Sequence, residues 1–221
     1  MPSAELSGLV EGLRANGPNL AGPPIEVRAE FEEMLATIPF ADDLTSEAIS
    51  LGGVPGFRFT SPQAAADKIL LYLHGGAYVV GSATGYRSLA AELGRATGAT
   101  SYAIDYRLAP EHPYPAAVDD AVTAYRALLA QGVPAHQIVI AGDSAGGGLT
   151  LAMLIRLRDA GDALPAAALL ISPWADLGCT AASLTSKAAQ DPSLTPEGLR
   201  ATAALYLNGA DARTPAASPI F

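Results

Sequence analysis

The sequence predicts an α/β fold in which a mostly parallel sheet is flanked by helices. Three observations support this prediction. From about residue 69, short apolar runs alternate with amphipathic stretches, glycines follow several of those stretches, and 50% of the 221 residues are hydrophobic while only 16% are charged. Alternating strands and helices are typical of βαβ units, and a chain of this length and composition can bury a sizeable core.

The expected strands fall into two groups. Residues 48–51 and 56–60, separated by Gly52-Gly53, predict an antiparallel hairpin at the beginning of the sheet. Four later runs are almost continuously apolar, as strands covered on both faces must be. These four expected strands are 69–73, 100–104, 137–141 and 167–171.

Helical periodicity predicts helices between and after these strands. One helix is expected to end at Gly98 and another at Gly132, because glycine is suited to the left-handed position that follows a helix. A third helix, over 144–160, is apolar almost all round, which predicts burial under the sheet. A fourth is expected over 196–207, with proline at its first helical position.

The two ends of the chain lie outside this alternation and are richer in helix and turn signals. We therefore expect a core domain over residues 46–174. Residues 1–45 and 175–221 are expected to supply the two parts of a helical cap.

Charge and composition exclude several classes of partner. A net charge of −9 argues against binding to nucleic acid or to an anionic membrane surface. The N-terminus has no basic stretch followed by an apolar one, and no apolar run approaches the roughly 20 residues that span a bilayer, so a cytoplasmic location is expected. The single cysteine, Cys179, cannot form an internal disulfide and is expected to be a small buried or half-buried residue.

No metal or cofactor is expected. The three histidines are isolated from one another, and no cluster of cysteines or carboxylates has the spacing of a metal site. The run Gly146-Gly147-Gly148 lacks the lysine and the spacing of a phosphate-binding loop.

The segment Gly142-Asp143-Ser144-Ala145-Gly146 predicts a nucleophile elbow, because it directly follows an expected strand and begins an expected helix. Ser144 is the candidate nucleophile. Gly142 and Gly146 are needed because a tight strand-to-helix turn brings the backbone close to its neighbours. Asp143 is expected to point into the scaffold and to have a structural role.

The segment His74-Gly75-Gly76-Ala77 follows another expected strand, at the same carboxyl edge of the sheet. The backbone N–H groups of Gly75 and Gly76, with that of Ala145 at the helix start, are the expected oxyanion-hole donors. His74 is expected to order the loop and not to act in catalysis.

Together these motifs resemble the hormone-sensitive-lipase group of α/β-hydrolases, the bacterial family IV esterases. The resemblance also rests on Tyr78 and Gly147, which extend the two motifs, on the block Asp105 to Ala117, and on Ser172-Pro173-Trp174 and Tyr206-Leu207-Asn208-Gly209. It extends over roughly residues 20–221. It implies an α/β-hydrolase fold with a helical cap, no cofactor, and hydrolysis of short-chain acyl esters through an acyl-enzyme at Ser144. It also implies that His74, Ala77, Tyr78 and Asp143 line or support the substrate pocket.

The sequence departs from the family in two places. Ala77 replaces a third glycine, a change that keeps the backbone N–H. No histidine follows Ser144, although the family places an acid and then a histidine on two later strands. We therefore expect a sheet that lacks the last two strands, a chain truncated at its C-terminus, and weak or absent activity. His112 and His136 are poorly placed to substitute as the base, and Arg107 is expected to pair with Glu111.

Two consequences follow for the strand 167–171 and for function. This strand is expected to lie at an exposed edge, where unpaired backbone groups favour self-association. An alternative to an ester hydrolase is a non-catalytic, receptor-like homologue that binds a small ligand in the same pocket.

Overall fold

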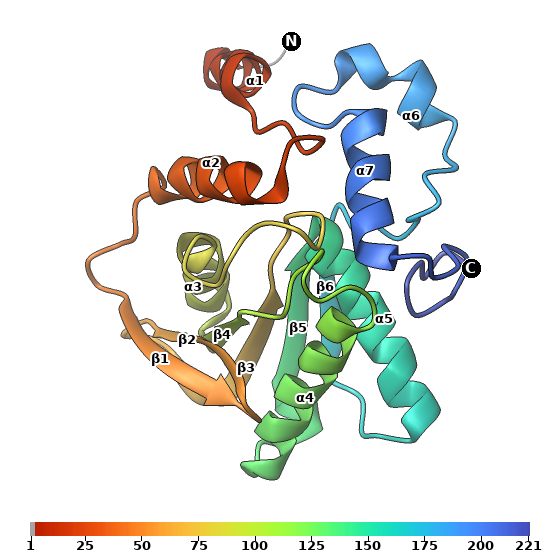
Figure 1. The fold of residues 1–221 in the computed structure, drawn as a ribbon. Coiled ribbons are helices and arrows are strands. Elements are labelled where there is room, and N and C mark those ends of the chain that lie inside the picture. Colours follow the sequence, from red (N-terminus) through yellow and green to blue (C-terminus); the bar gives the residue numbers. More distant parts are fainter. Residues whose placement is uncertain (1–2) are drawn as a thin grey trace.

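The computed structural model describes residues 3–221, and these contain a six-stranded sheet with the order β1-β2-β4-β3-β5-β6 (Figure 1). The last four strands in this order run parallel, as the sequence predicts. In chain order the strands are β1 (Thr45–Leu51), β2 (Val54–Thr60), β3 (Ala65–Leu73), β4 (Ala99–Ile104), β5 (Ile138–Asp143) and β6 (Ala167–Ile171).

The expected hairpin is confirmed. β1 and β2 pair antiparallel around Gly52 and Gly53, whose φ angles of 63° and 94° require residues without a side chain. β2 then pairs antiparallel with β4 and not with β3, its successor in the chain. The hairpin therefore extends one edge of the parallel sheet.

Helices cover both faces of the sheet. The helices are α1 (Ala4–Asn16), α2 (Pro24–Ala36), α3 (Arg87–Thr97), α4 (Ala116–Ala130), α5 (Ser144–Ala160), α6 (Ser183–Ser186) and α7 (Pro196–Leu207), with short 3-10 turns at Ala135–Gln137 and Ala188–Gln190. Side chains alternate along β3: Leu71 and Leu73 join the core under α4 and α5, whereas Leu70 and Tyr72 join the core under α3.

The helix ends follow the sequence signals. Gly98 adopts φ 64° after α3, and Gly132 adopts φ 89° shortly after α4. Thr195 caps α7 by accepting a hydrogen bond from the N–H of Gly198. The expectation that α5 is buried is wrong in part: Leu149 and Met153 are buried, but Leu154 is half-buried because it lines an open groove beside β6.

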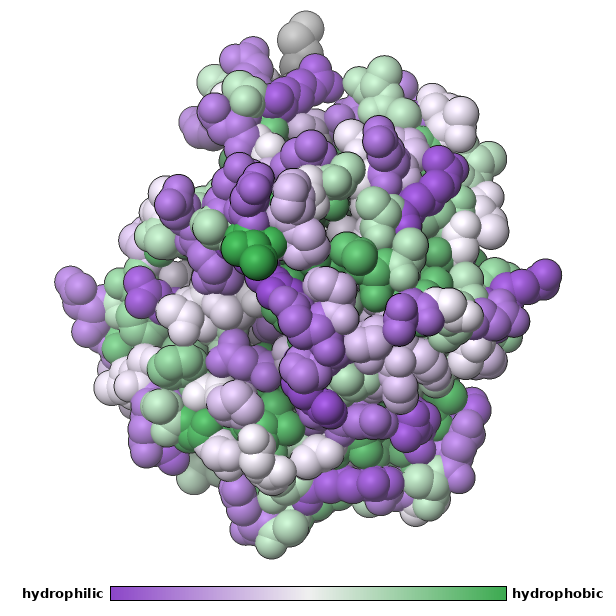
Figure 2. Space-filling view, in the orientation of Figure 1, coloured by the Kyte–Doolittle hydropathy of each residue, from purple (hydrophilic) through white to green (hydrophobic). Residues whose placement is uncertain are grey.

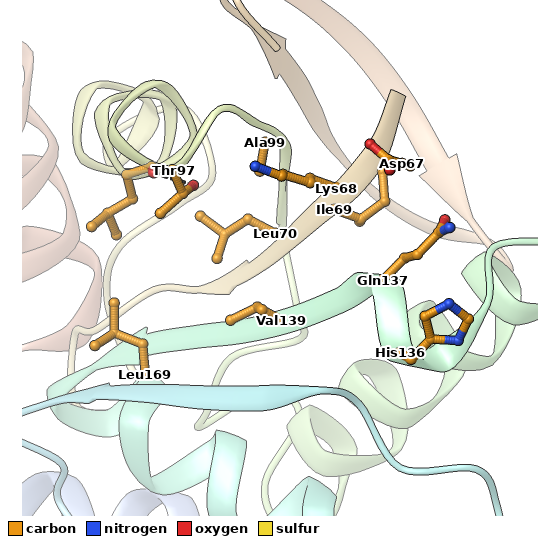
Figure 3. Close-up of a pocket in the computed structure, with 11 residues that line it drawn as sticks. Asp67, Lys68, Ile69, Leu70, Thr97, Ala99, His136, Gln137, Val139 and Leu169 are labelled. Carbon is orange, nitrogen blue, oxygen red and sulfur yellow. Dashed lines mark hydrogen bonds between the residues drawn. The ribbon is translucent and has the colours of Figure 1, made fainter. Parts of the chain in front are cut away.

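Within residues 3–221, β6 occupies the edge of the sheet and pairs with β5 alone. Leu169 is 43% exposed and Ile171 is 36% exposed, although both belong to an apolar strand. A groove of about 510 Å³ lies beside it on the α3 side, and a second of about 530 Å³ lies on the α5 side. Figure 3 shows the side chains of Leu70, Val139 and Leu169 directed into the first groove from three neighbouring strands.

The helices α1, α2, α6 and α7 gather above the edge of the sheet at which the parallel strands end (Figure 1). Figure 2, drawn in the same orientation, shows that the surface on this side of the molecule is mainly hydrophilic, with small hydrophobic areas scattered over it. Among residues 3–221, none of the helices combines the length and the apolar character needed to cross a membrane. Cys179 is buried and free.

Candidate active site

Ser144 lies at a sharp turn between β5 and α5. Its φ angle of 51° is in the left-handed region, which a serine adopts at a cost of about 1–3 kcal/mol. The strain is sustained by close packing, and the N–H of Trp174 donates to the Ser144 carbonyl at 2.7 Å. The half-buried side chain is therefore held at the carboxyl edge of the sheet, in the geometry of a nucleophile elbow.

Two glycines make this turn possible. A Cβ atom on Gly142 would overlap the backbone of Gly146, and one on Gly146 would overlap the carbonyl oxygen of Leu73. Both obstacles are backbone atoms that cannot rotate away. The sequence-based reason for these two glycines is thus confirmed.

The loop after β3 is held in an unusual conformation. Gly76, Ala77 and Tyr78 have φ angles of 113°, 54° and 62°. The N–H groups of Val79 and Val80 both donate to the Gly76 carbonyl at 2.9 Å, which closes a tight turn. This turn lies beside Ser144, because Gly76, Ala77 and Ser144 line one cavity.

The structure corrects one expected donor in this loop. The N–H of Gly75 donates to the Asp143 carboxylate at 2.7 Å, so it is not free for a substrate oxygen. Within residues 3–221 no protein acceptor is found for the N–H groups of Gly76 and Ala77, and the N–H of Ala145 lies in the first turn of α5, where helix N–H groups have no acceptor within the helix. The sequence could not reveal this, because the acceptor is a side chain 68 residues away.

Asp143 has the scaffold position expected for it. Its carboxylate accepts hydrogen bonds from the Tyr72 hydroxyl at 2.6 Å, from the Gly75 N–H, and from the Tyr86 hydroxyl at 3.4 Å. Burial raises the pKa of Asp143, and these donors oppose that rise. The carboxylate therefore ties the elbow to the loop after β3.

His74 is fully enclosed and stacks on Tyr106 with ring centroids 4.2 Å apart. Its Nδ1 lies 2.7 Å from the Gly75 carbonyl, which can only accept, so Nδ1 carries the proton. Its Nε2 is buried and has no partner in the described part of the chain. Burial lowers the pKa of His74 to about 4, so the ring is neutral near pH 7.

The other two histidines lie away from the nucleophile. His112 is exposed in the loop before α4. His136 precedes β5, whereas Ser144 follows it, and six strand residues separate their ends by about 20 Å. The Ser144 hydroxyl makes no hydrogen bond with any residue from 3 to 221.

A cavity of about 100 Å³ opens onto Ser144. Its floor comes from the elbow, from the Gly76-Ala77 turn and from Tyr86. Its other walls come from four apolar side chains near the two ends of the chain. These are Leu20, Phe31, Leu194 and Leu199. The sequence did not single out these residues, since their meeting depends on how the end segments fold over the sheet.

Tyr78 does not line this cavity. It is buried and stacks on Tyr206 with ring centroids 3.9 Å apart, and burial raises its pKa. The groove in Figure 3 is also separate from the cavity at Ser144, with which it shares no lining residue. His136, Gln137, Asp67 and Lys68 lie toward its amino end, where the strands begin (Figure 3).

The expected ion pair between Arg107 and Glu111 is wrong. Arg107 forms a bidentate pair with Asp120, with a shortest distance of 2.7 Å, and its N–H also donates to that carboxylate. Glu111 instead pairs with Arg28 at 2.6 Å. In the described residues, no three histidine, cysteine or carboxylate side chains are grouped as metal ligands.

Known proteins resemble the chain in sequence. A family profile described as "alpha/beta hydrolase fold" matches residues 70–221. An acetyl-hydrolase from Streptomyces hygroscopicus is 49% identical over 218 residues, which cover 90% of this chain and 73% of that protein. An esterase from Acinetobacter venetianus is 36% identical over 204 residues, 92% of this chain and 66% of that protein.

Solved structures agree with these matches. An esterase from the bacterial hormone-sensitive lipase family superposes with a TM-score of 0.94 at 42% identity, covering all of this chain and 74% of that one. The esterase EstE5, soaked with ethyl alcohol, gives a TM-score of 0.94 at 45% identity over 99% of this chain and 74% of that one. This chain thus spans about two thirds to three quarters of the length of these relatives. It belongs to the α/β-hydrolase family, in its hormone-sensitive-lipase group.

Proposed function

We propose that the chain is a serine carboxylic-ester hydrolase that acts on short-chain acyl esters through an acyl-enzyme at Ser144. The observation that carries this proposal is the strained elbow, whose Ser144 lines a small apolar cavity together with Gly76 and Ala77, and the N–H groups of these two residues have no protein acceptor in residues 3–221. Relatives named acetyl-hydrolase and esterase support the same chemistry.

In the proposed reaction the Ser144 oxygen attacks the ester carbonyl carbon, and its proton passes to solvent water, which later returns a proton to the leaving alcohol. The carbonyl oxygen becomes negative and accepts hydrogen bonds from the N–H groups of Gly76, Ala77 and Ala145. One such donor typically stabilises the transition state by about 3 kcal/mol. The bond to the alcohol then breaks, the alcohol leaves with a proton, and water hydrolyses the acyl-enzyme to the acid.

Removal of the Ser144 proton is expected to be the slow step, because no histidine in residues 3–221 lies where it could act as the base. His74 is enclosed with a low pKa, while His112 and His136 lie elsewhere. We therefore expect the 221-residue chain to react slowly. Serine hydrolases stripped of their triad still retain roughly 10³ to 10⁴ over water from the oxyanion hole and binding.

We propose that residues 1–45 and 175–221 act as a two-part cap over the core of residues 46–174. Support comes from the cavity at Ser144: Leu20 and Phe31 reach it from the first segment, and Leu194 and Leu199 from the second. A cavity of about 100 Å³ has room for only a few carbon atoms. This size favours acetyl and butyryl groups.

The direct test is labelling of the purified chain with a fluorophosphonate probe, followed by intact mass, in parallel with Ser144→Ala. The expected result is slow addition of one probe mass that disappears in Ser144→Ala, with hydrolysis of p-nitrophenyl acetate and butyrate showing the same dependence. Folded protein that gives neither would contradict the proposal.

The unpartnered Ser144 hydroxyl also suits a second candidate, a receptor-like protein that binds a small ligand and does not turn it over. The two candidates differ in outcome. Saturable binding of butyrate, without Ser144-dependent labelling or hydrolysis, would favour the receptor-like function.

A further inference from the structure

Arg28 lies on α2, in the N-terminal segment, and all three nitrogens of its guanidinium donate hydrogen bonds. Nε donates to the Val79 carbonyl at 2.7 Å, and Nη2 donates to the Ala109 carbonyl at 2.7 Å. The same group forms a bidentate pair with Glu111 at 2.8 and 2.6 Å. Four short hydrogen bonds thus join α2 to two separate loops of the core.

One of these acceptors belongs to the turn that borders Ser144. Val79 is one of the two residues whose N–H groups close the turn onto the Gly76 carbonyl. The neighbouring Tyr78 carbonyl accepts from the N–H of Ala109 at 2.9 Å, and Ala109 is also bound by Arg28. Arg28 therefore completes a closed ring of contacts with Tyr78, Val79 and Ala109 on the C-terminal side of the turn.

This turn needs external support. Ala77 and Tyr78 both have positive φ angles, a conformation that costs non-glycine residues about 1–3 kcal/mol each and persists only where the surroundings hold it. The Tyr78 and Val79 carbonyls share peptide planes with the N–H groups of Val79 and Val80, and both of these N–H groups donate to the Gly76 carbonyl. The Gly76 carbonyl shares its own peptide plane with the Ala77 N–H, so holding this carbonyl sets the direction of that donor beside Gly76.

We propose that Arg28 is a positioning residue that holds the Gly76-Ala77 turn in the orientation required to bind an oxyanion at Ser144. This inference rests on the proposed function for its catalytic meaning. The arrangement needs the planar fork of arginine, because a lysine ammonium cannot serve two carbonyls and a carboxylate with the same geometry.

Glu111 orients the guanidinium from the far side. The hydrogen bonds from Arg28 lower the pKa of Glu111 to about 2. The pair therefore stays ionised throughout the pH range of an esterase assay. The contacts of Arg28 with Val79, Ala109 and Glu111, which together form a clamp on the turn, are thus the same in assays at different pH values.

The test compares Arg28→Gln and Arg28→Lys with Glu32→Ala as a matched control. Glu32 lies on the same helix and also contacts the core, accepting from the Ser82 hydroxyl at 2.9 Å, but it does not touch the turn. Circular dichroism and thermal unfolding establish that each variant is folded. Amide ¹H–¹⁵N spectra then report on Gly76 and Ala77 directly, without any need for activity.

Both Arg28 variants are expected to shift or broaden the Gly76 and Ala77 amide signals, while Glu32→Ala leaves them in place. For labelling by a fluorophosphonate, the maximal rate constant is expected to fall at least tenfold in Arg28→Gln and at least threefold in Arg28→Lys. The concentration for half-maximal rate should change less than threefold, because the apolar walls of the cavity remain.

Unchanged Gly76 and Ala77 signals in folded Arg28→Gln would overturn the proposal. Full recovery of the labelling rate in Arg28→Lys would also overturn it, since a positive charge alone would then suffice. If the unmodified chain shows no labelling at Ser144, the proposed ester hydrolysis fails, and the amide spectra still decide the role of Arg28.

Discussion

Because the enclosed His74 ring stays neutral in the folded protein, the protein is expected to become less stable as the pH falls below neutral. The ring lies between Tyr106 and Tyr86, its Nδ1–H is used by the Gly75 carbonyl, and no acceptor or carboxylate faces Nε2 in residues 3–221. Burial lowers its pKa from 6.5 to about 4. Between pH 6.5 and pH 4, His74 is therefore protonated in the unfolded chain and neutral in the folded chain.

The size and sign of the effect follow from linkage. A difference of about 2.5 pKa units corresponds to about 3 kcal/mol, since each unit contributes about 1.4 kcal/mol. The contribution of His74 to the free energy of unfolding is fully present above pH 6.5 and declines as the pH falls toward 4. Below pH 4 this group causes no further loss. Because small domains typically have only 5–15 kcal/mol in total, the loss is readily measured.

Urea unfolding from pH 7.5 to 4 tests this expectation with two variants that cannot titrate. His74→Asn can keep a hydrogen bond to the Gly75 carbonyl, whereas His74→Phe keeps the stack on Tyr106. Both variants are expected to be less stable than the unmodified protein at pH 7.5, and this difference should shrink by about 3 kcal/mol by pH 4. A difference that stays constant across this range would refute the reasoning.

Three further predictions concern the scaffold and the edge strand. Asp143→Ala should cost about 2–4 kcal/mol by urea unfolding, because three donors lose their acceptor, whereas Asp143→Asn should cost clearly less; equal losses would contradict this. Gly146→Ala should prevent folding, as judged by circular dichroism, because its Cβ would overlap backbone, whereas Gly12→Ala on open α1 should be neutral or stabilising by up to about 1 kcal/mol. We also propose self-association through the β6 edge: sedimentation velocity should show concentration-dependent association that Leu169→Lys reduces, and a monomer at all concentrations would argue against it.

The parallel part of the fold could be predicted because each parallel strand is marked by a local apolar run. The expected strand 167–171 matches β6 at both ends. β3 begins four residues earlier than expected, at Ala65, because residues 65–68 are polar or small and pair only at the margin of the sheet. The pairing of β2 with β4 left no local signal, since strand order is decided by packing across the whole sheet.

The parts of the candidate site that could be predicted are those formed by short runs of adjacent residues. Ser144 and the turn after β3 are examples, since a few adjacent residues define each of them. The partner of Glu111 could not be predicted: Arg28 is 83 residues away, and Arg107 is much nearer in sequence. Only the placement of α2 over the core decides which arginine reaches that carboxylate.

The choice of Gly76 and Ala77 as the proposed oxyanion donors follows from how the loop after β3 is fastened at both ends. Asp143 takes the N–H of Gly75 at the first end, and Arg28 takes the carbonyl of Val79 at the other. Between these points, the N–H groups of Gly76 and Ala77 are left without a protein acceptor in residues 3–221, and both border the cavity at Ser144. We expect an alanine at position 77 to keep the proposed donor, because the donor is the backbone and the contacts at both ends of the loop maintain its positive φ. Loosening the contacts at either end should therefore weaken oxyanion binding while the nucleophile stays in place.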